Sequence, residues 1–110
     1  MIAVYMLQKG GHTVGFEAAG HAMFREAGSD IVCSAVSALT QTAVLGLTEL
    51  LELELDLSID EEEGICCRLK PGLTPGQQQQ AQLILDTMWI GLRSIEESYA
   101  ENLRVCERSV

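Results

Sequence analysis

The chain has 110 residues and a formal net charge of −9, because it carries 16 acidic side chains and only seven lysines and arginines. This length allows one domain, residues 1–110, with a single modest core. So few cations disfavour direct binding of nucleic acid, whose phosphates require a basic surface, and an acidic chain suits a basic partner instead.

The first twenty residues predict a β-hairpin. Residues 1–7 and 12–19 form β-like runs, and Lys9-Gly10-Gly11 between them is a turn sequence. Gly20 and Gly28 then bound a link to the next element. Because glycine adopts positive φ without strain, this link allows a sharp turn or a mobile loop.

Residues 31–50 predict a long helix that is apolar nearly all round, which suits a position between a sheet and another layer. Residues 31–48 contain no charged side chain and are about long enough to span a membrane. The segment also contains several polar residues, which are Ser34, Ser37, Thr40, Gln41, Thr42 and Thr48. We therefore expect a helix inside the protein and no membrane partner.

The second half predicts two strands and a helix. Leucine and acidic residues alternate through 51–57, which indicates a half-buried strand with leucine inward. An acidic turn at 60–64 and a return strand at 65–69 follow. Thr74 is an N-cap candidate ahead of Pro75, so a second helix should begin there and run to about Tyr99. Its apolar face would comprise Ile84, Met88, Leu92, Ile95 and Tyr99.

Residues 102–107 are β-like and could add a final edge strand. The order ββαββα, with this additional strand, predicts a small single α+β domain. Its antiparallel or mixed sheet of about four to five strands would pack against two long helices. Aromatic residues make up only 5% of the chain, so the core must be mainly aliphatic, and a homodimer would bury surplus apolar surface.

The four cysteines, Cys33, Cys66, Cys67 and Cys106, show no Cys-x-x-Cys spacing. Cys66 and Cys67 would point to opposite faces of a strand. This pattern supports neither a metal site nor a disulfide framework, and we expect no cofactor. Residues 1–11 lack the pattern of a signal peptide, so we expect a cytoplasmic, reducing location.

Cys33 and His21 are the side chains that a thiol protease requires. A cysteine is nucleophilic as the thiolate, which a helix N-terminus and a neighbouring imidazole both favour. Asp30 or Ser29 is a candidate N-cap, which would place Cys33 in the first helical turn. His21 lies too far along the chain to reach Cys33 within one element, so the two would meet by folding.

The stretches Gly20-His21-Ala22, Gly28-Ser29-Asp30 and Cys33-Ser34-Ala35-Val36-Ser37 resemble the signature of Prp, a family of ribosomal-processing cysteine proteases. Ser34 departs from the alanine that is usual in that signature. The resemblance implies a homodimeric endopeptidase that removes the N-terminal extension of large-subunit ribosomal protein twenty-seven, cutting after an aromatic residue.

We expect Cys33 to attack the scissile carbonyl and His21 to act as general base and acid. Backbone N–H groups near Cys33 and Ser34 would hold the oxyanion. Asp30 could cap the helix, orient the imidazole or do both, and Ser37 could support the thiolate or only permit close packing. Gly20, Ala22, Met23, Phe24 and Gly28 would belong to a substrate loop or a fixed connection.

The same residues also allow interpretations without catalysis. Cys33 could be a small buried apolar residue of a helix, and His21 could be an exposed residue at a strand end. The rival function is a non-catalytic acidic homodimeric module that binds a basic ribosomal protein as an assembly factor. Rapid alkylation of Cys33 near neutral pH would favour the protease, and an inert thiol would favour the module.

Overall fold

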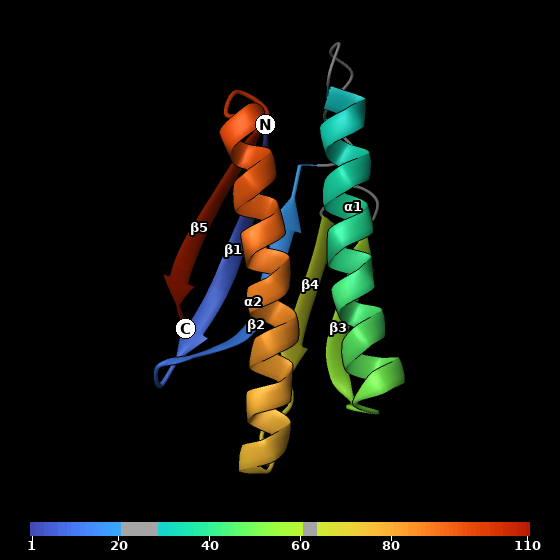
Figure 1. Cartoon of the computed structure of the whole chain (residues 1–110), viewed down its shortest axis with the longest axis vertical. Helices are drawn as coiled ribbons and strands as arrows, with labels where there is room; N and C mark the ends of the chain where they lie inside the picture. Colours follow the sequence, from blue (N-terminus) through green and yellow to red (C-terminus); the bar gives the residue numbers. More distant parts are fainter. Residues whose placement is uncertain (21–28, 61–63) are drawn as a thin grey trace.

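The computed structural model describes residues 1–20, 29–60 and 64–110, which form a five-stranded mixed sheet with two long helices on one of its faces (Figure 1). In chain order the elements are β1 (Ile2–Lys9), β2 (His12–Ala19), α1 (Ser29–Leu45), the π-helical turn η2 (Gly46–Leu50), β3 (Leu55–Asp60), β4 (Gly64–Leu69), α2 (Pro75–Ser98) and β5 (Leu103–Ser109). The predicted α+β architecture is confirmed.

The strands lie in the order β3-β4-β2-β1-β5, so β3 and β5 form the two edges. The β1–β2, β2–β4 and β3–β4 pairs are antiparallel, and the β1–β5 pair is parallel. Gly10 and Gly11 form the β1–β2 turn at φ values of 60° and 80°, where glycine is not strained. The predicted final strand is confirmed as β5, and its parallel pairing with β1 makes the sheet mixed rather than antiparallel.

The predicted helix at 31–50 begins two residues earlier, at Ser29. Its C-terminal end agrees with the prediction, although the last turn is π-helical and the N–H of Leu51 donates to the carbonyl of Gly46 at 3.3 Å. Ser29 is the first described residue after 21–28, and the side chains of Ser29 and Asp30 lie outside the described part of the structure. The capping role of Asp30 or Ser29 therefore stays a prediction.

The predicted strand at 51–57 is displaced along the chain, since β3 spans Leu55–Asp60. Residues 51–54 form a connection instead, in which the N–H of Leu53 donates to the carbonyl of Leu47 at 3.0 Å and Glu52 adopts a φ of 53°. Leu53 is buried, so the alternation reports burial correctly but mistakes a helix-to-strand connection for a strand. Leu57 is 42% exposed because β3 is an edge strand.

The second helix forms as predicted. Thr74 accepts a hydrogen bond from the N–H of Gln77 and the Gln77 side chain accepts one from the N–H of Thr74, which completes a capping box ahead of Pro75. The buried face of α2 consists of Ala81, Leu85, Met88 and Leu92. Ile84 and Ile95 of the predicted face are only half-buried, and Tyr99 is exposed.

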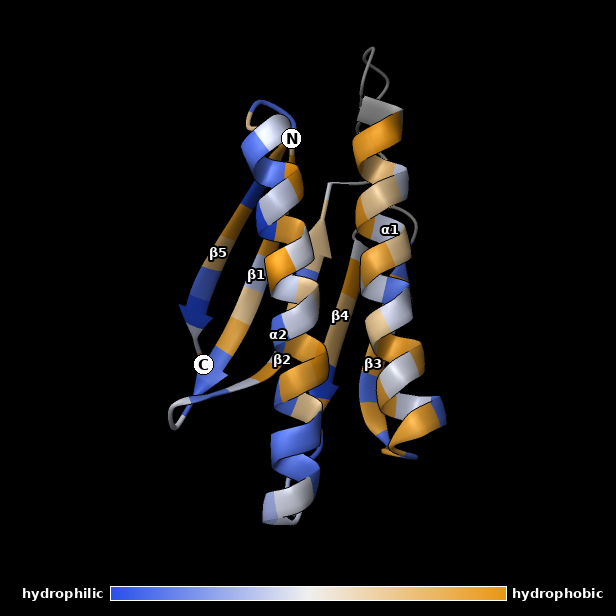
Figure 2. Ribbon diagram, in the orientation of Figure 1, coloured by the Kyte–Doolittle hydropathy of each residue, from blue (hydrophilic) through white to orange (hydrophobic). Residues whose placement is uncertain are grey.

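Hydrophobic residues predominate along α1, whereas α2 mixes hydrophobic and hydrophilic residues (Figure 2). Residues 31–50 satisfy the length and composition of a membrane-crossing helix, with 33% of the apolar window buried. The core helix of a water-soluble protein passes the same test. Here Val32, Val36, Ala43 and Leu47 contribute to a core that they share with β1, β2, β4, β5 and α2, and Leu55 of β3 packs against it.

Candidate active site

Cys33 is the fifth residue of α1, close to the end where the backbone N–H groups of a helix lack partners within the helix. Its side chain is half-buried and packs against the hydrophobic core. The positive end of the helix dipole favours negative charge at such a position. The Cys33 thiol is therefore partly accessible near the N-terminal end of the helix.

Cys33 lies on the flank of α1 that faces away from α2. Val32, Val36, Thr40, Ala43 and Leu47 define the buried face of the helix, and Cys33 lies about 60° to one side of its centre at 100° per residue. The opposite flank meets α2, where Leu39 lies against Gly91 and Gly46 lies against Ile84. Since α1 covers the β3–β4 side of the sheet (Figure 1), Cys33 faces the β3 edge.

Ser34 and Ser37 accompany Cys33 on α1. Ser34 is exposed, and Ser37 is half-buried one turn further along the same flank. The Ser37 carbonyl accepts a hydrogen bond from the Oγ1 of Thr40 at 3.3 Å. The structure therefore brings Cys33 and Ser37 to one side of the helix and leaves Ser34 facing solvent.

The other predicted site residues are only partly covered. His21, Ala22, Met23, Phe24 and Gly28 lie outside the described residues, and so does the side chain of Asp30. Gly20 is described and directly follows β2 with a φ of 101°, a conformation that favours glycine. The role of His21 as the base, the orienting role of Asp30 and the substrate loop stay predictions.

The remaining cysteines have different surroundings from Cys33. All four belong to the described part of the chain, and none forms a disulfide there. Cys67 points into the core and its pKa is raised to about 12, first by burial and then by Cys66. Cys66, on the opposite face of β4, has a pKa raised by burial and next by the Glu17 carboxylate, which its Sγ contacts at 3.8 Å. Both thiols are held protonated at neutral pH, which makes them poor nucleophiles.

The Cys67 thiol predicts an alkaline loss of stability. Its folded pKa of about 12 lies above the ordinary value, so the unfolded chain loses the proton first as the pH rises. The contribution of the neutral Cys67 thiol to folding stability is fully present below about pH 8 and is lost as the pH rises toward 12. We expect up to about 2 kcal/mol to be lost between about pH 8 and pH 10.5. Urea unfolding of the wild type and Cys67→Ala at both pH values measures it, and an equal loss in both proteins would contradict it.

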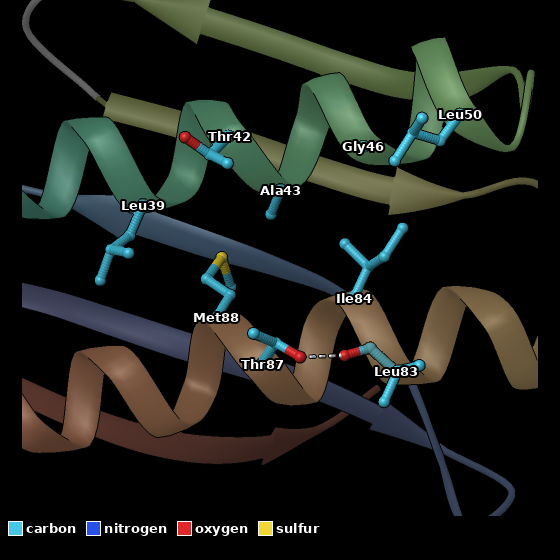
Figure 3. Close-up of a pocket in the computed structure, with 9 residues that line it drawn as sticks. All are labelled: Leu39, Thr42, Ala43, Gly46, Leu50, Leu83, Ile84, Thr87 and Met88. Carbon is cyan, nitrogen blue, oxygen red and sulfur yellow. Dashed lines mark hydrogen bonds between the residues drawn. The ribbon is translucent and has the colours of Figure 1, made fainter.

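A feature that the sequence analysis did not identify is an apolar groove of about 380 Å³ between α1 and α2 on the side away from the sheet (Figure 3). It is lined by Leu39, Thr42, Ala43, Gly46, Leu50, Leu83, Ile84, Thr87 and Met88. Leu50 and Leu83 at its margins are 79% and 70% exposed. The sequence signal for the groove is the absence of charge from residues 31–48, which by itself indicates only burial.

Comparison with known proteins relates the chain to one family. The family model described as "Cysteine protease Prp" matches residues 1–104. The ribosomal processing cysteine protease Prp of Bacillus subtilis (strain 168) is 40% identical over 91 residues, which cover 82% of this chain and 81% of the relative.

Two solved structures of Prp from S. aureus have the same fold. One is a complex with a substrate peptide, and it has a TM-score of 0.85 and 32% identity while covering 98% of this chain and 100% of that one. The other contains a covalently linked product peptide, with a TM-score of 0.80, 33% identity and the same coverage. Fold and sequence therefore agree over almost the entire chain.

Proposed function

The chain belongs to the Prp family of cysteine proteases, and we propose that Cys33 is its nucleophile and His21 its general base and acid. His21 takes the thiol proton, and the Cys33 thiolate attacks the scissile carbonyl to form a tetrahedral oxyanion. The oxyanion collapses as the C–N bond breaks, and His21 gives the proton to the leaving amine. Water activated by His21 then hydrolyses the thioester and regenerates the thiol.

One observation carries the assignment of the nucleophile: Cys33 is half-buried at the start of α1 on the flank that faces away from α2. The backbone N–H groups of the first turn of α1, just ahead of Cys33, lack partners within the helix and are the donors that we propose for the oxyanion. The covalently linked product peptide of the S. aureus relative supports a covalent mechanism in this fold. Cys66 and Cys67, with raised pKa values, do not compete for the role.

The substrate that we propose is the N-terminal extension of large-subunit ribosomal protein twenty-seven, cut after an aromatic residue. The support is the relatives' description as ribosomal processing proteases, together with a net charge of −9 that attracts a basic ribosomal protein. We also propose a cytoplasmic location, where the reducing environment keeps the Cys33 thiol reduced.

Mass spectrometry of a peptide that spans the extension and the first residues of the mature ribosomal protein tests this substrate. We expect the wild-type chain to cut one bond, on the carboxyl side of an aromatic residue. A scrambled peptide of the same composition is the control. Equal cleavage of both peptides would contradict the narrow specificity, and an intact peptide that nevertheless binds would favour the non-catalytic module.

We propose that the apolar groove is the interface of a homodimer. Two copies that each carry a charge of −9 repel one another, so they approach most easily through a surface without charge. The groove lining contains no charged residue, and the exposed Leu50 and Leu83 at its margins can fill the groove of a second copy. An isologous arrangement uses the same patch on both subunits, which suits this self-complementary surface.

Leu83→Asp should weaken this dimer, because each subunit would bury a carboxylate in an apolar groove. We expect the dissociation constant to rise at least about 100-fold. Sedimentation equilibrium measures the effect, and Val110→Asp, at an exposed apolar residue beyond β5, is the control. A dimer of unchanged strength in Leu83→Asp would exclude the groove as the interface.

A further inference from the structure

The edge strand β3 offers both a backbone edge and exposed apolar side chains. Leu57 and Ile59 pair with Cys67 and Ile65 of β4, which point into the core, so all four side chains project to the face that carries the helices. Leu57 is nevertheless 42% exposed and Ile59 68% exposed. Helix α1 therefore leaves the outer margin of β3 uncovered.

The backbone of β3 is suited to pairing with another strand. The register between β3 and β4 is regular from Leu55 to Asp60, without a bulge, and the strand contains no lysine or proline. A bulge, a lysine or a proline is a usual means by which proteins block a sheet edge. Within residues 1–20, 29–60 and 64–110, no backbone hydrogen bond joins residues 55–59 to a loop, a turn or a helix.

The opposite edge of the same sheet differs. In β5 the N–H of Val105 donates to the carboxylate of Glu96 on α2 at 2.7 Å. Glu96 thereby occupies a backbone donor that an added strand would need. The two edges are built differently, and β3 is the one left available.

The available edge runs beside the helix that carries Cys33. The hydrogen bond from Leu53 to Leu47 fixes the start of the returning chain against the end of the helix. From there β3 runs back under α1, on the side of the sheet that lies away from α2 (Figure 1). Cys33 faces this side of the sheet.

We propose that the peptide substrate binds as an added strand along β3, with its alternate apolar side chains on Leu57 and Ile59 and its scissile bond beside Cys33. This inference rests on the proposed function, which supplies an extended basic peptide as the occupant. Strand addition gives affinity through the backbone and specificity through alternate side chains. The carboxylates of Glu52, Glu54 and Asp56, on and just before β3, complement a basic peptide.

Backbone pairing predicts that every second amide of the bound peptide contributes to binding. A set of extension peptides, each with one N-methylated amide, is titrated into the Cys33→Ala chain and followed by fluorescence anisotropy. Methylation of amides that point to β3 should weaken binding at least about tenfold, and methylation of the alternate amides should have little effect. A uniform response along the peptide would overturn the added strand.

The proposed contact between the peptide and the side chains of β3 can be tested with a matched control. Ile59→Asp should weaken binding of the unmodified peptide about tenfold, although its added negative charge alone would attract a basic peptide. Ile90→Asp changes the same residue type at the same 68% exposure on α2 and should bind normally. Equal binding by both variants would overturn the role of β3. Wild-type cleavage of the unmodified peptide separately reports the proposed function, and its absence would contradict that function.

Discussion

Cys33→Ala should abolish peptide cleavage while the protein stays folded. We expect turnover to fall at least about 10⁴-fold, because no other group in the proposed mechanism can form the covalent intermediate. The Cys33 side chain is half-buried at the start of α1, so loss of its sulfur should cost about 1 kcal/mol or less of folding free energy. Cleavage of the ribosomal-protein extension peptide and urea unfolding measure the two effects.

Cys66→Ala is the matched control for this prediction. Cys66 is also half-buried and outside any disulfide, but its pKa is raised by burial and by the Glu17 carboxylate. We expect Cys66→Ala to cleave at the wild-type rate, and iodoacetamide at neutral pH to modify Cys33 ahead of Cys66 and Cys67. Full activity in Cys33→Ala, or lost activity in Cys66→Ala, would refute the assignment of the nucleophile.

Gly64→Ala should destabilise the sheet strongly, although it adds only one methyl group. Gly64 has a φ of 102°, and a Cβ there would lie 1.9 Å from the carbonyl oxygen of Ala18 in β2. The Ala18 carbonyl oxygen belongs to the backbone, and the added Cβ is fixed to the backbone of residue 64, so neither can move away by a side-chain rotation. We expect a loss of more than about 3 kcal/mol. Since β2 continues into Gly20, separation of β2 from β4 should also reduce peptide cleavage.

Two other glycines separate the causes of this loss. Gly72 has a φ of 90° with nothing within 4 Å of an added Cβ, so Gly72→Ala carries only the backbone strain of about 1–2 kcal/mol. At Gly15 a Cβ would meet the Cys67 carbonyl oxygen at 2.1 Å without a positive φ, so Gly15→Ala carries only the clash. Urea midpoints should fall least for Gly72→Ala and most for Gly64→Ala. Equal midpoints for those two would show that β2 does not approach Gly64 this closely.

Local chemistry predicted much of the fold. The Gly10-Gly11 turn and the Thr74-Pro75 start of α2 are set by residues adjacent in sequence, and both form as expected. The start of β3 was missed because Leu53 packs into the core from a connection, where its N–H donates to the Leu47 carbonyl, and not from a strand. Alternation of leucine and acid reports which side chains are buried, but it does not report what buries them.

The candidate site, like the fold, could be predicted from the sequence only in part. The sequence around Cys33 identified the family and the thiol, and the structure places that thiol at the start of a helix. The flank on which Cys33 lies depends on where α2 packs, which is set by Leu39 against Gly91. A contact between two helices distant in sequence leaves no local signal. The pairing of Cys33 with His21 stays a prediction.

The parallel pair of β1 and β5 constrains how this protein is made. β1 joins β2 on one side and β5 on the other, and Ile2 pairs with Leu103, about a hundred residues later. During synthesis from the N-terminus, β1 therefore exposes an unpaired edge until β5 has been translated. Contacts of such high order fold slowly, on the scale of milliseconds to seconds. The nascent chain thus completes its sheet, at the edge opposite β3, only after α2 has been translated.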